Sequence, residues 1–444
     1  MADILIEHGT VITLNGQRRI IEDGAVAIRG DRIVAVDSHA ALATAGPFET
    51  KIDARRMVVL PGLVDCHAHA GHGLVKTLGA DDGDAWSRAC EAFYTHASSE
   101  HFWAAEAALA ALERLKFGVT CGVSLFGGGD SILRTDEPVY ADRHCESVRE
   151  VGIRTFLAVG PCRPPFPRRF VRWNGGATET LAVSFEQQLA TCDTIVKRWH
   201  GTDAGRINIC IVSPTLRREH FDNADATAVT LAELQEQAPA ARALSRRHGI
   251  LFTQDGHTRG SVAYAHDPLN ILGPDALLSH STDLTDEEIR IIAETDTRVV
   301  HNPSAIASIR GRCPVPELLD AGANVVLGSD ATAPDRSGDM FRHMQQCMHY
   351  HRRHFRDPDV LPPGKVLEMV TIDAARALGL DAEIGSIEVG KKGRPDSGGS
   401  VQAAHLPPAN AALSHGLLRE RQRCRYRYRR RPYSDARPRS TVCE

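Results

Sequence analysis

Seven side chains that could bind a metal ion or move a proton lie at or just after short apolar runs: His67, His69, Asp255, His257, His280, His301 and Asp330. Imidazole nitrogen and carboxylate oxygen are common zinc ligands and common acid–base groups. Side chains two residues apart on a strand point the same way, so His67 and His69 can reach one ion. One such pair is by itself weak evidence for a metal site, because a chain with 21 histidines contains such pairs by chance. Together with the other strand-end residues, it favours a metal centre.

The elements expected to position these residues are alternating strands and helices. From about residue 61 to 385, helix-like stretches separate short apolar runs at 154–159, 207–212, 249–253, 276–279, 298–300 and 324–327. Buried parallel strands that alternate with helices indicate a βα architecture, and at this length a barrel. The carboxyl ends of barrel strands share one face, where active sites form. The strand-end residues are therefore expected to converge there.

Composition and charge argue against several other kinds of protein. The chain has 444 residues, of which 42% are hydrophobic and 24% charged, as in ordinary globular proteins. A net charge of −4 argues against a general nucleic-acid binder, and no run approaches the roughly 18 apolar residues of a membrane span. The 11 cysteines are scattered without a CxxC pair, and no secretory signal is visible. We therefore expect a cytoplasmic protein that acts on a small molecule, with neither nucleic acid nor membrane as a partner.

Several blocks of the sequence resemble the amidohydrolase superfamily in the order in which that family carries them. PGLVDCHAHAGHG resembles its first-strand signature. The later blocks are LLSHSTDLTDEEI, VVHNPSAIASIRGRCPVPELLDAGANVVLGSDATAPDRSGDMF and VLEMVTIDAARALGLDAEIGSIEVGKK. The similarity is strongest to the branch of cytosine deaminases and chlorohydrolases, which includes S-adenosylhomocysteine deaminases, guanine deaminases and triazine hydrolases. It covers roughly residues 3–393.

This resemblance implies an α/β fold, namely a distorted (β/α)8 TIM-like barrel with a small β-sandwich domain made from both chain termini. The N-terminal part of the sandwich is expected at residues 1–60, where short apolar runs are separated by turn-forming residues. The barrel is expected at residues 61–385 and the return to the sandwich at residues 386–444. Members are often dimers or larger, so a homo-oligomer is an option here.

The resemblance also implies a ligand set and a reaction. It places His67, His69 and Asp330 on one divalent metal ion, zinc in preference to iron. It matches His280 and His301 to positions that contact the water or the substrate. The implied reaction is hydrolytic deamination, or displacement of another leaving group, on a nitrogen-containing heterocycle by a metal-activated water. In it Asp330 accepts the water proton and His280 hydrogen-bonds the attacking oxygen.

The fifth strand departs from the family pattern. Members show His-x-x-Glu there, with the histidine as a ligand and the glutamate as a proton shuttle, but this chain reads GILFTQDGHTR from Gly249. Counting forward from Gly249 without a gap puts Asp255 at the position of the fourth ligand. An imidazole is a softer ligand than a carboxylate, which favours His257, and we prefer His257. If Asp255 is not the ligand, it is a candidate for the shuttle.

The missing glutamate keeps two rival functions open. No Glu occurs between Glu236 and Glu287, so the ring protonation of an aromatic deaminase has no obvious donor. One rival is a hydrolase of a non-aromatic cyclic amide or amidine, which needs no such step. The other is a protein with the amidohydrolase fold that is non-catalytic or defective.

The C-terminal tail is the second departure. Residues 394–444 hold eleven Arg, no Lys and four acidic residues, a net charge of +7, whereas the preceding 393 residues carry −11. The interleaved Arg and Tyr at 419–433 would suit a nucleic-acid tail. We favour a frameshift near residue 393. Codons that could encode residues 422–434, when read in the frame shifted by one base, can encode a strand that resembles the family's C-terminal strand. Resequencing the DNA across this junction tests that hypothesis.

Overall fold

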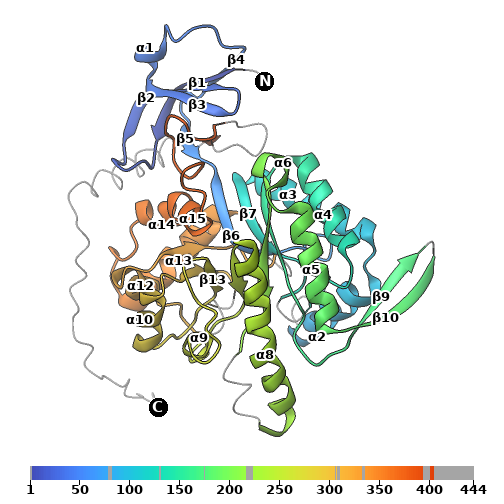
Figure 1. Cartoon of the computed structure of the whole chain (residues 1–444). Coiled ribbons are helices and arrows are strands. Elements are labelled where there is room, and N and C mark those ends of the chain that lie inside the picture. The colour runs from blue at the N-terminus through green and yellow to red at the C-terminus, as the bar shows by residue number, and fades with distance from the viewer. Residues whose placement is uncertain are drawn as a thin grey trace, which may run out of the picture.

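The fold is a nearly closed α/β barrel with a small β-sheet at one end (Figure 1). The computed structural model describes residues 3–78, 83–129, 132–174, 176–216, 224–305, 307, 311–332, 336–393 and 401–404. None of the helices in these ranges combines the length and apolarity that crossing a membrane requires.

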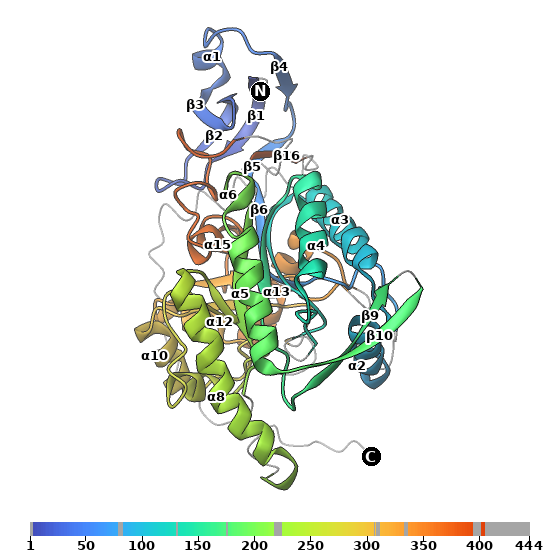
Figure 2. The same cartoon turned by 45° about the vertical axis from the view of Figure 1, so that its right-hand side comes forward.

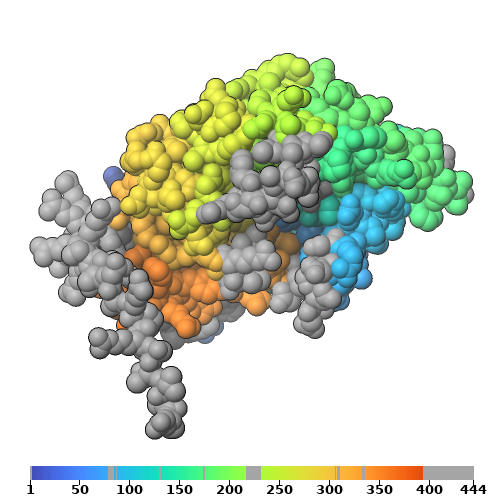
Figure 3. Space-filling model, turned by 90° about the horizontal axis from the view of Figure 1, so that it is seen from below, coloured from blue at the N-terminus to red at the C-terminus, as the bar shows by residue number. Residues whose placement is uncertain are grey.

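Eight parallel strands form the barrel sheet, in the order β15-β14-β13-β12-β11-β8-β7-β6. They are β6 (Leu63–His69), β7 (Val119–Leu125), β8 (Arg154–Val159), β11 (Ile207–Ser213), β12 (Phe252–Gln254), β13 (Ala276–Ser279), β14 (Arg298–His301) and β15 (Val325–Leu327). A parallel bridge between Ala68 and Asp330 joins the first strand to the chain that follows the last one. This bridge closes the ring. Seen from below, the chain runs around the barrel in colour order from cyan through green and yellow to orange (Figure 3).

Helices surround the strands, and α8 and the β9–β10 hairpin extend away from the barrel in both views (Figures 1 and 2). The longer helices are α2 (Gly83–Ala92), α3 (Glu100–Lys116), α4 (Pro138–Val151), α5 (Phe185–Trp199), α8 (Ala224–His248), α10 (Asp286–Glu294) and α13 (Met340–Phe355). Shorter elements are α9 (Ser261–His266), α12 (Val315–Asp320), α14 (Pro363–Met369), α15 (Ile372–Ala377), a π-helical turn at Phe93–Ala97, and the strands β9 (Arg168–Asn174) and β10 (Ala177–Val183). Two helices, α5 and α10, begin with capping boxes, whose N-cap residues are Ser184 and Thr285.

Alternation along the strands divides the barrel's apolar side chains into two clusters. Val299 of β14 packs in the cluster that includes helix residues such as Met344 of α13. Its neighbour Val300 packs in a second cluster with Val326 of β15 and Val212 of β11. Successive side chains of a strand point to opposite faces, so the second cluster fills the barrel and the first joins strands to helices.

The small sheet takes strands from both ends of the described chain. Its strands are β1 (Ile4–Ile12), β2 (Ile20–Arg29), β3 (Arg32–Ser38), β4 (Thr50–Asp53), β5 (Val58–Pro61) and β16 (Val401–Ala404), and β16 pairs with β5. The backbone at Gly390–Gly393 also bonds to β3 and the turn before it. Within the described residues this part is one six-stranded sheet. The division at residues 60 and 385 and the second sheet of a sandwich stay predictions, and residues 405–444 lie outside the described chain.

Candidate metal centre

Four elements bring five of the expected side chains together. His67 and His69 end β6, while Asp255, His280 and Asp330 follow β12, β13 and β15. One Asp330 oxygen lies 2.9 Å from Nε2 of His69 and 3.5 Å from Nε2 of His67. One Asp255 oxygen lies 3.1 Å from Nε2 of His280 and 3.4 Å from Nε2 of His67. Five groups that are far apart in sequence therefore meet at the carboxyl ends of the strands.

These residues fit a divalent metal ion. Donor atoms of His67, His69 and Asp330 lie within 4.8 Å of one another, and so do those of His67, Asp255 and His280. All five side chains are buried. Nε2 of His67 has no hydrogen-bond partner in the described structure although it faces two carboxylates. Two buried carboxylates among imidazoles suit the charge and the borderline softness of zinc.

The carboxylates are ionised at neutral pH. Burial acts to raise the pKa of Asp330, but His67 and His69 hold it well below its usual range. Burial likewise opposes ionisation of Asp255, and His67 and His280 nevertheless lower its pKa. Burial acts to lower the pKa of His69, but Asp330 and Asp255 raise it above its usual value. The site thus holds two buried carboxylates in their ionised form, stabilised by the neighbouring imidazoles.

Neighbouring polar groups orient the rings. Nδ1 of His69 lies 3.1 Å from the Gly127 carbonyl, which can only accept, so this nitrogen carries the proton and Nε2 is left for an ion. Nδ2 of Asn302 lies 3.4 Å from Nδ1 of His280. An amide NH2 can only donate, so His280 carries its proton on Nε2, toward Asp255.

Asn302 is a site residue that the sequence reasoning missed. It directly follows β14 and is fully buried. The signal was available, since a polar residue just after a barrel strand is the pattern that marked the other site residues. The family resemblance instead points to His301, one position earlier.

A buried ion pair behind the site was also missed. Asp65 of β6 accepts bonds from the Ser329 backbone N–H at 2.9 Å and the Ser329 hydroxyl at 2.6 Å. Its second partner is Arg114 of α3, whose Nη2 lies 3.1 Å away. The pair therefore connects β6 and α3 to the residue directly before Asp330.

The backbone at the site is held in an uncommon conformation. His280, Ser281 and Asp330 have φ of 65°, 48° and 63°, in the left-handed region that residues with a side chain rarely adopt. Such residues cluster at functional sites, where the surrounding structure holds them in place.

The structure places Asp255, and not His257, among the grouped metal-binding side chains. The His257 ring lies against Gln254 and Ser261, with Nε2 at 3.2 Å and Nδ1 at 2.9 Å. Residues 255 and 257 would share a face only if extended backbone continued, but β12 ends at Gln254 and Gly256 turns the chain at φ 84°. The turn sends the Asp255 carboxylate to His67 and His280 and directs His257 elsewhere.

His301 also lies away from the centre, contrary to the expectation that it contacts water or substrate. It lies two residues after Val299 on β14, so its side chain points to the same face of the strand, toward the helices. Its ring centroid is 5.5 Å from that of His351 on α13. Asn302 occupies the position beside His280 instead.

His72 lies at the edge of the centre. Its ring stacks on His69 with centroids 5.1 Å apart, and on Tyr94 at 5.7 Å. Glu106 holds the following turn by accepting from the backbone N–H groups of Gly73 and Leu74. Lys76 turns toward Glu113, with which it forms an ion pair at 3.7 Å.

Comparison with known proteins identifies the family. The profile of the amidohydrolase family matches residues 58–393, and the chain belongs to that family. The 5'-deoxyadenosine deaminase of Methanococcoides burtonii is 30% identical over 393 residues, which cover 86% of this chain and 81% of the relative. The 5-methylthioadenosine/S-adenosylhomocysteine deaminase of Moorella thermoacetica is 30% identical over 409 residues, which cover 88% of this chain and 84% of the relative.

Solved structures agree in fold. The zinc-bound adenosine deaminase of Xanthomonas campestris superposes with a TM-score of 0.74 at 23% identity, covering 94% of this chain and 88% of its own. The zinc complex of atrazine chlorohydrolase from Arthrobacter aurescens has a TM-score of 0.68 at 21% identity, covering 88% and 85%.

Proposed function

We propose that this amidohydrolase removes an amino group hydrolytically from a nitrogen heterocycle, with an adenine nucleoside as the first substrate class to test. The observation that carries the proposal is the contact of His67, His69 and His280 with the two buried carboxylates Asp255 and Asp330. Relatives at 30% identity are deaminases of adenine nucleosides, which supports the substrate class.

We assign one divalent ion to His67, His69, Asp255 and Asp330, with zinc preferred to iron. When bound, such an ion would lower the pKa of a water molecule to about 7 and so supply hydroxide at neutral pH. Zinc is present in two proteins that share the fold.

The chain's own groups carry the proton transfers. Asp330 is ionised and accepts a proton from the attacking water, then returns one to the departing amine. His280 donates through Nε2, because Asn302 donates to Nδ1. That donor is placed to hydrogen-bond the attacking oxygen.

A second candidate function rests on the fifth-strand region. With Asp255 assigned to the ion, it is no longer free to shuttle a proton to the ring. In the described ranges, the carboxylate oxygens within 4.0 Å of the ring nitrogens of His67, His69 and His280 belong to Asp255 and Asp330, and none to a glutamate. A cyclic amide or amidine, which opens without ring protonation, is therefore the alternative substrate class.

The cellular setting is part of the proposal. The described cysteines are all free and buried, which suits a reducing compartment such as the cytoplasm. A small-molecule substrate and a homo-oligomeric state complete this proposal.

An ammonia-release assay on zinc-loaded protein tests it. Adenine nucleosides should release ammonia, and the His67→Ala variant and chelator-treated enzyme should not. Ring opening of cyclic amides without ammonia would favour the alternative. A zinc-loaded protein inactive on both classes would support a non-catalytic chain.

A further inference from the structure

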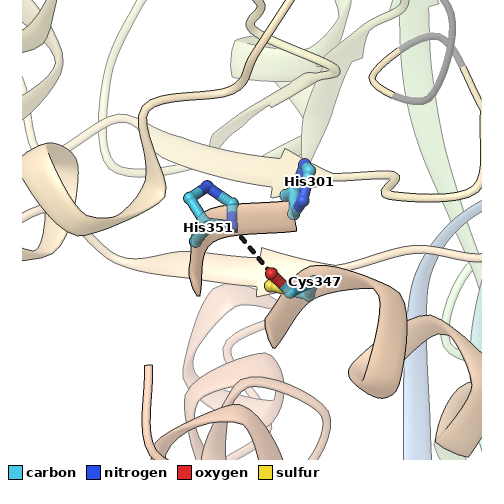
Figure 4. A group of neighbouring side chains, drawn as sticks. All are labelled: His301, Cys347 and His351. Carbon is cyan, nitrogen blue, oxygen red and sulfur yellow. Dashed lines mark hydrogen bonds between the residues drawn. The ribbon is translucent and has the colours of Figure 1, made fainter. Parts of the chain in front are cut away.

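A second cluster of metal-binding side chains lies behind the barrel wall. His301 ends β14, and Cys347 and His351 stand on α13, the helix that packs outside that strand (Figure 4). One donor atom from each lies within 4.8 Å of the others, and all three residues are buried. None of the three belongs to the candidate metal centre.

His301 has no use in the apoprotein that explains its burial. The side chain is 1% exposed, and neither ring nitrogen has a hydrogen-bond partner in the described structure. Burial lowers the pKa of His301 well below its usual value, and His351 lowers it further, so the ring is neutral. A neutral imidazole offers a lone pair, and a buried polar group without a partner calls for an unseen one such as an ion.

His351 is held against more acceptors than it can satisfy. Its Nδ1 lies 2.8 Å from the carbonyl of Cys347, and its Nε2 lies 3.0 Å from the carbonyl of Cys313. Burial lowers the pKa of His351, and a neutral ring has one N–H only. The other nitrogen therefore turns a lone pair toward an oxygen. Binding an ion would use that lone pair while the N–H keeps one carbonyl, the usual outer partner of a ligating histidine.

Cys347 supplies a sulfur on the same face of the helix. It is four residues before His351, and side chains at that spacing are neighbours on a helix. Burial raises the pKa of the Cys347 thiol, so the thiol is neutral and an ion that binds it must displace its proton. Two imidazoles and one thiolate select zinc or another borderline-to-soft ion over magnesium or calcium.

We propose that His301, Cys347 and His351 form a second metal site that takes Zn²⁺ or a similar d-block ion. It would join α13 to β14 directly before Asn302, the residue that contacts His280. Its sulfur distinguishes it from the barrel centre, where all the donors are nitrogen and oxygen.

Cobalt titration of the metal-free, full-length protein tests the site. Co²⁺ bound to thiolate gives a charge-transfer absorption in the near ultraviolet, which the barrel centre cannot produce. We expect that absorption and about two Co²⁺ per chain. Cys347→Ala should lose the absorption and one ion. His67→Ala should lose an ion but keep the absorption, so failure of the proposed function and failure of this site are distinguishable.

Cys192→Ala is the matched control, because Cys192 is also fully buried between a helix and the barrel. It should keep both the absorption and the two ions. Absence of the absorption in folded, cobalt-loaded wild-type protein overturns the proposal, and so does its persistence in Cys347→Ala.

If Cys347→Ala does not fold, X-ray absorption spectroscopy of the zinc-loaded His67→Ala variant decides. A zinc coordination shell that includes one sulfur atom supports the site. A shell of nitrogen and oxygen alone overturns it.

Discussion

Nδ2 of Asn302 lies 3.4 Å from Nδ1 of His280, and this contact keeps the proton of that ring on Nε2, which faces Asp255. Replacing Asn302 by Ala should leave the His280 ring free to change tautomer and orientation. We expect kcat to fall by about tenfold to a hundredfold, or about 1.4 to 2.7 kcal/mol, with metal content and Tm unchanged. Steady-state kinetics, elemental analysis and thermal denaturation measure these three quantities.

Asn324→Ala is the control for Asn302→Ala, because Asn324 bonds a backbone carbonyl, that of Asp373, outside the centre. An unchanged kcat in Asn302→Ala would show that His280 does not depend on this contact.

Removing Asp255 should cost the barrel ion, whereas removing His257 should not. Loss of a residue that only hydrogen-bonds a metal ligand already weakens metal binding by about 10 to 100-fold. Asp255→Ala should therefore weaken metal binding by more than about 100-fold. His257→Ala should keep near-wild-type affinity, because its ring faces Gln254 and Ser261. Zinc competition with a coloured chelator measures both affinities. The reverse ranking would return the ligand role to His257.

Breaking the Asp65–Arg114 pair should destabilise the fold strongly. Asp65→Ala leaves the Arg114 guanidinium buried without its carboxylate and removes two acceptors from Ser329. The expected loss is about 3 to 5 kcal/mol in the free energy of unfolding, measured by urea denaturation. The exposed pair Asp53–Arg55 supplies the control, and Asp53→Ala should leave the denaturation curve unchanged. Equal curves for Asp65→Ala and wild type would show that the pair contributes nothing.

Gly328 should not tolerate a side chain. A Cβ there would lie 2.4 Å from Oδ1 of Asn302 and 2.7 Å from the carbonyl oxygen of His67. Gly328→Ala should therefore lower stability by about 1 to 3 kcal/mol and lower activity as well. Gly16→Ala is its control, because a Cβ at that position meets nothing within 4 Å. A fully active, stable Gly328→Ala protein would contradict this packing.

Acid should destabilise the protein through His144. Burial, and secondarily Arg114, lowers the pKa of this ring to about 3 from an ordinary value of 6.5. Between those values the unfolded chain binds the proton and the folded chain does not, so stability falls as pH falls. The slope is at most about 1.4 kcal/mol per pH unit.

The test is urea denaturation between about pH 4 and 7. His144→Gln should flatten the slope, and His101→Gln, at a side chain that is 87% exposed, should not. Equal slopes in wild type and His144→Gln would exclude His144 as the source.

Sequence alone could predict the barrel and most of its centre. Strand-end positions converge in any parallel barrel, so His67, His69, His280 and Asp330 could be grouped without knowing a single distance. The alternation of strand and helix patterns is local, and local patterns are readable from the chain.

Tertiary structure decided the rest, because it depends on where each strand stops and which way each side chain faces. The turn at Gly256 places Asp255, and not His257, beside His67. The alternation of β14 sent His301 to the helix layer and left Asn302 beside His280. The pairing of Asp65 with Arg114 brings together two side chains that are 49 positions apart in the chain. A one-residue change in strand end reverses the face of every following side chain, and only packing fixes that end.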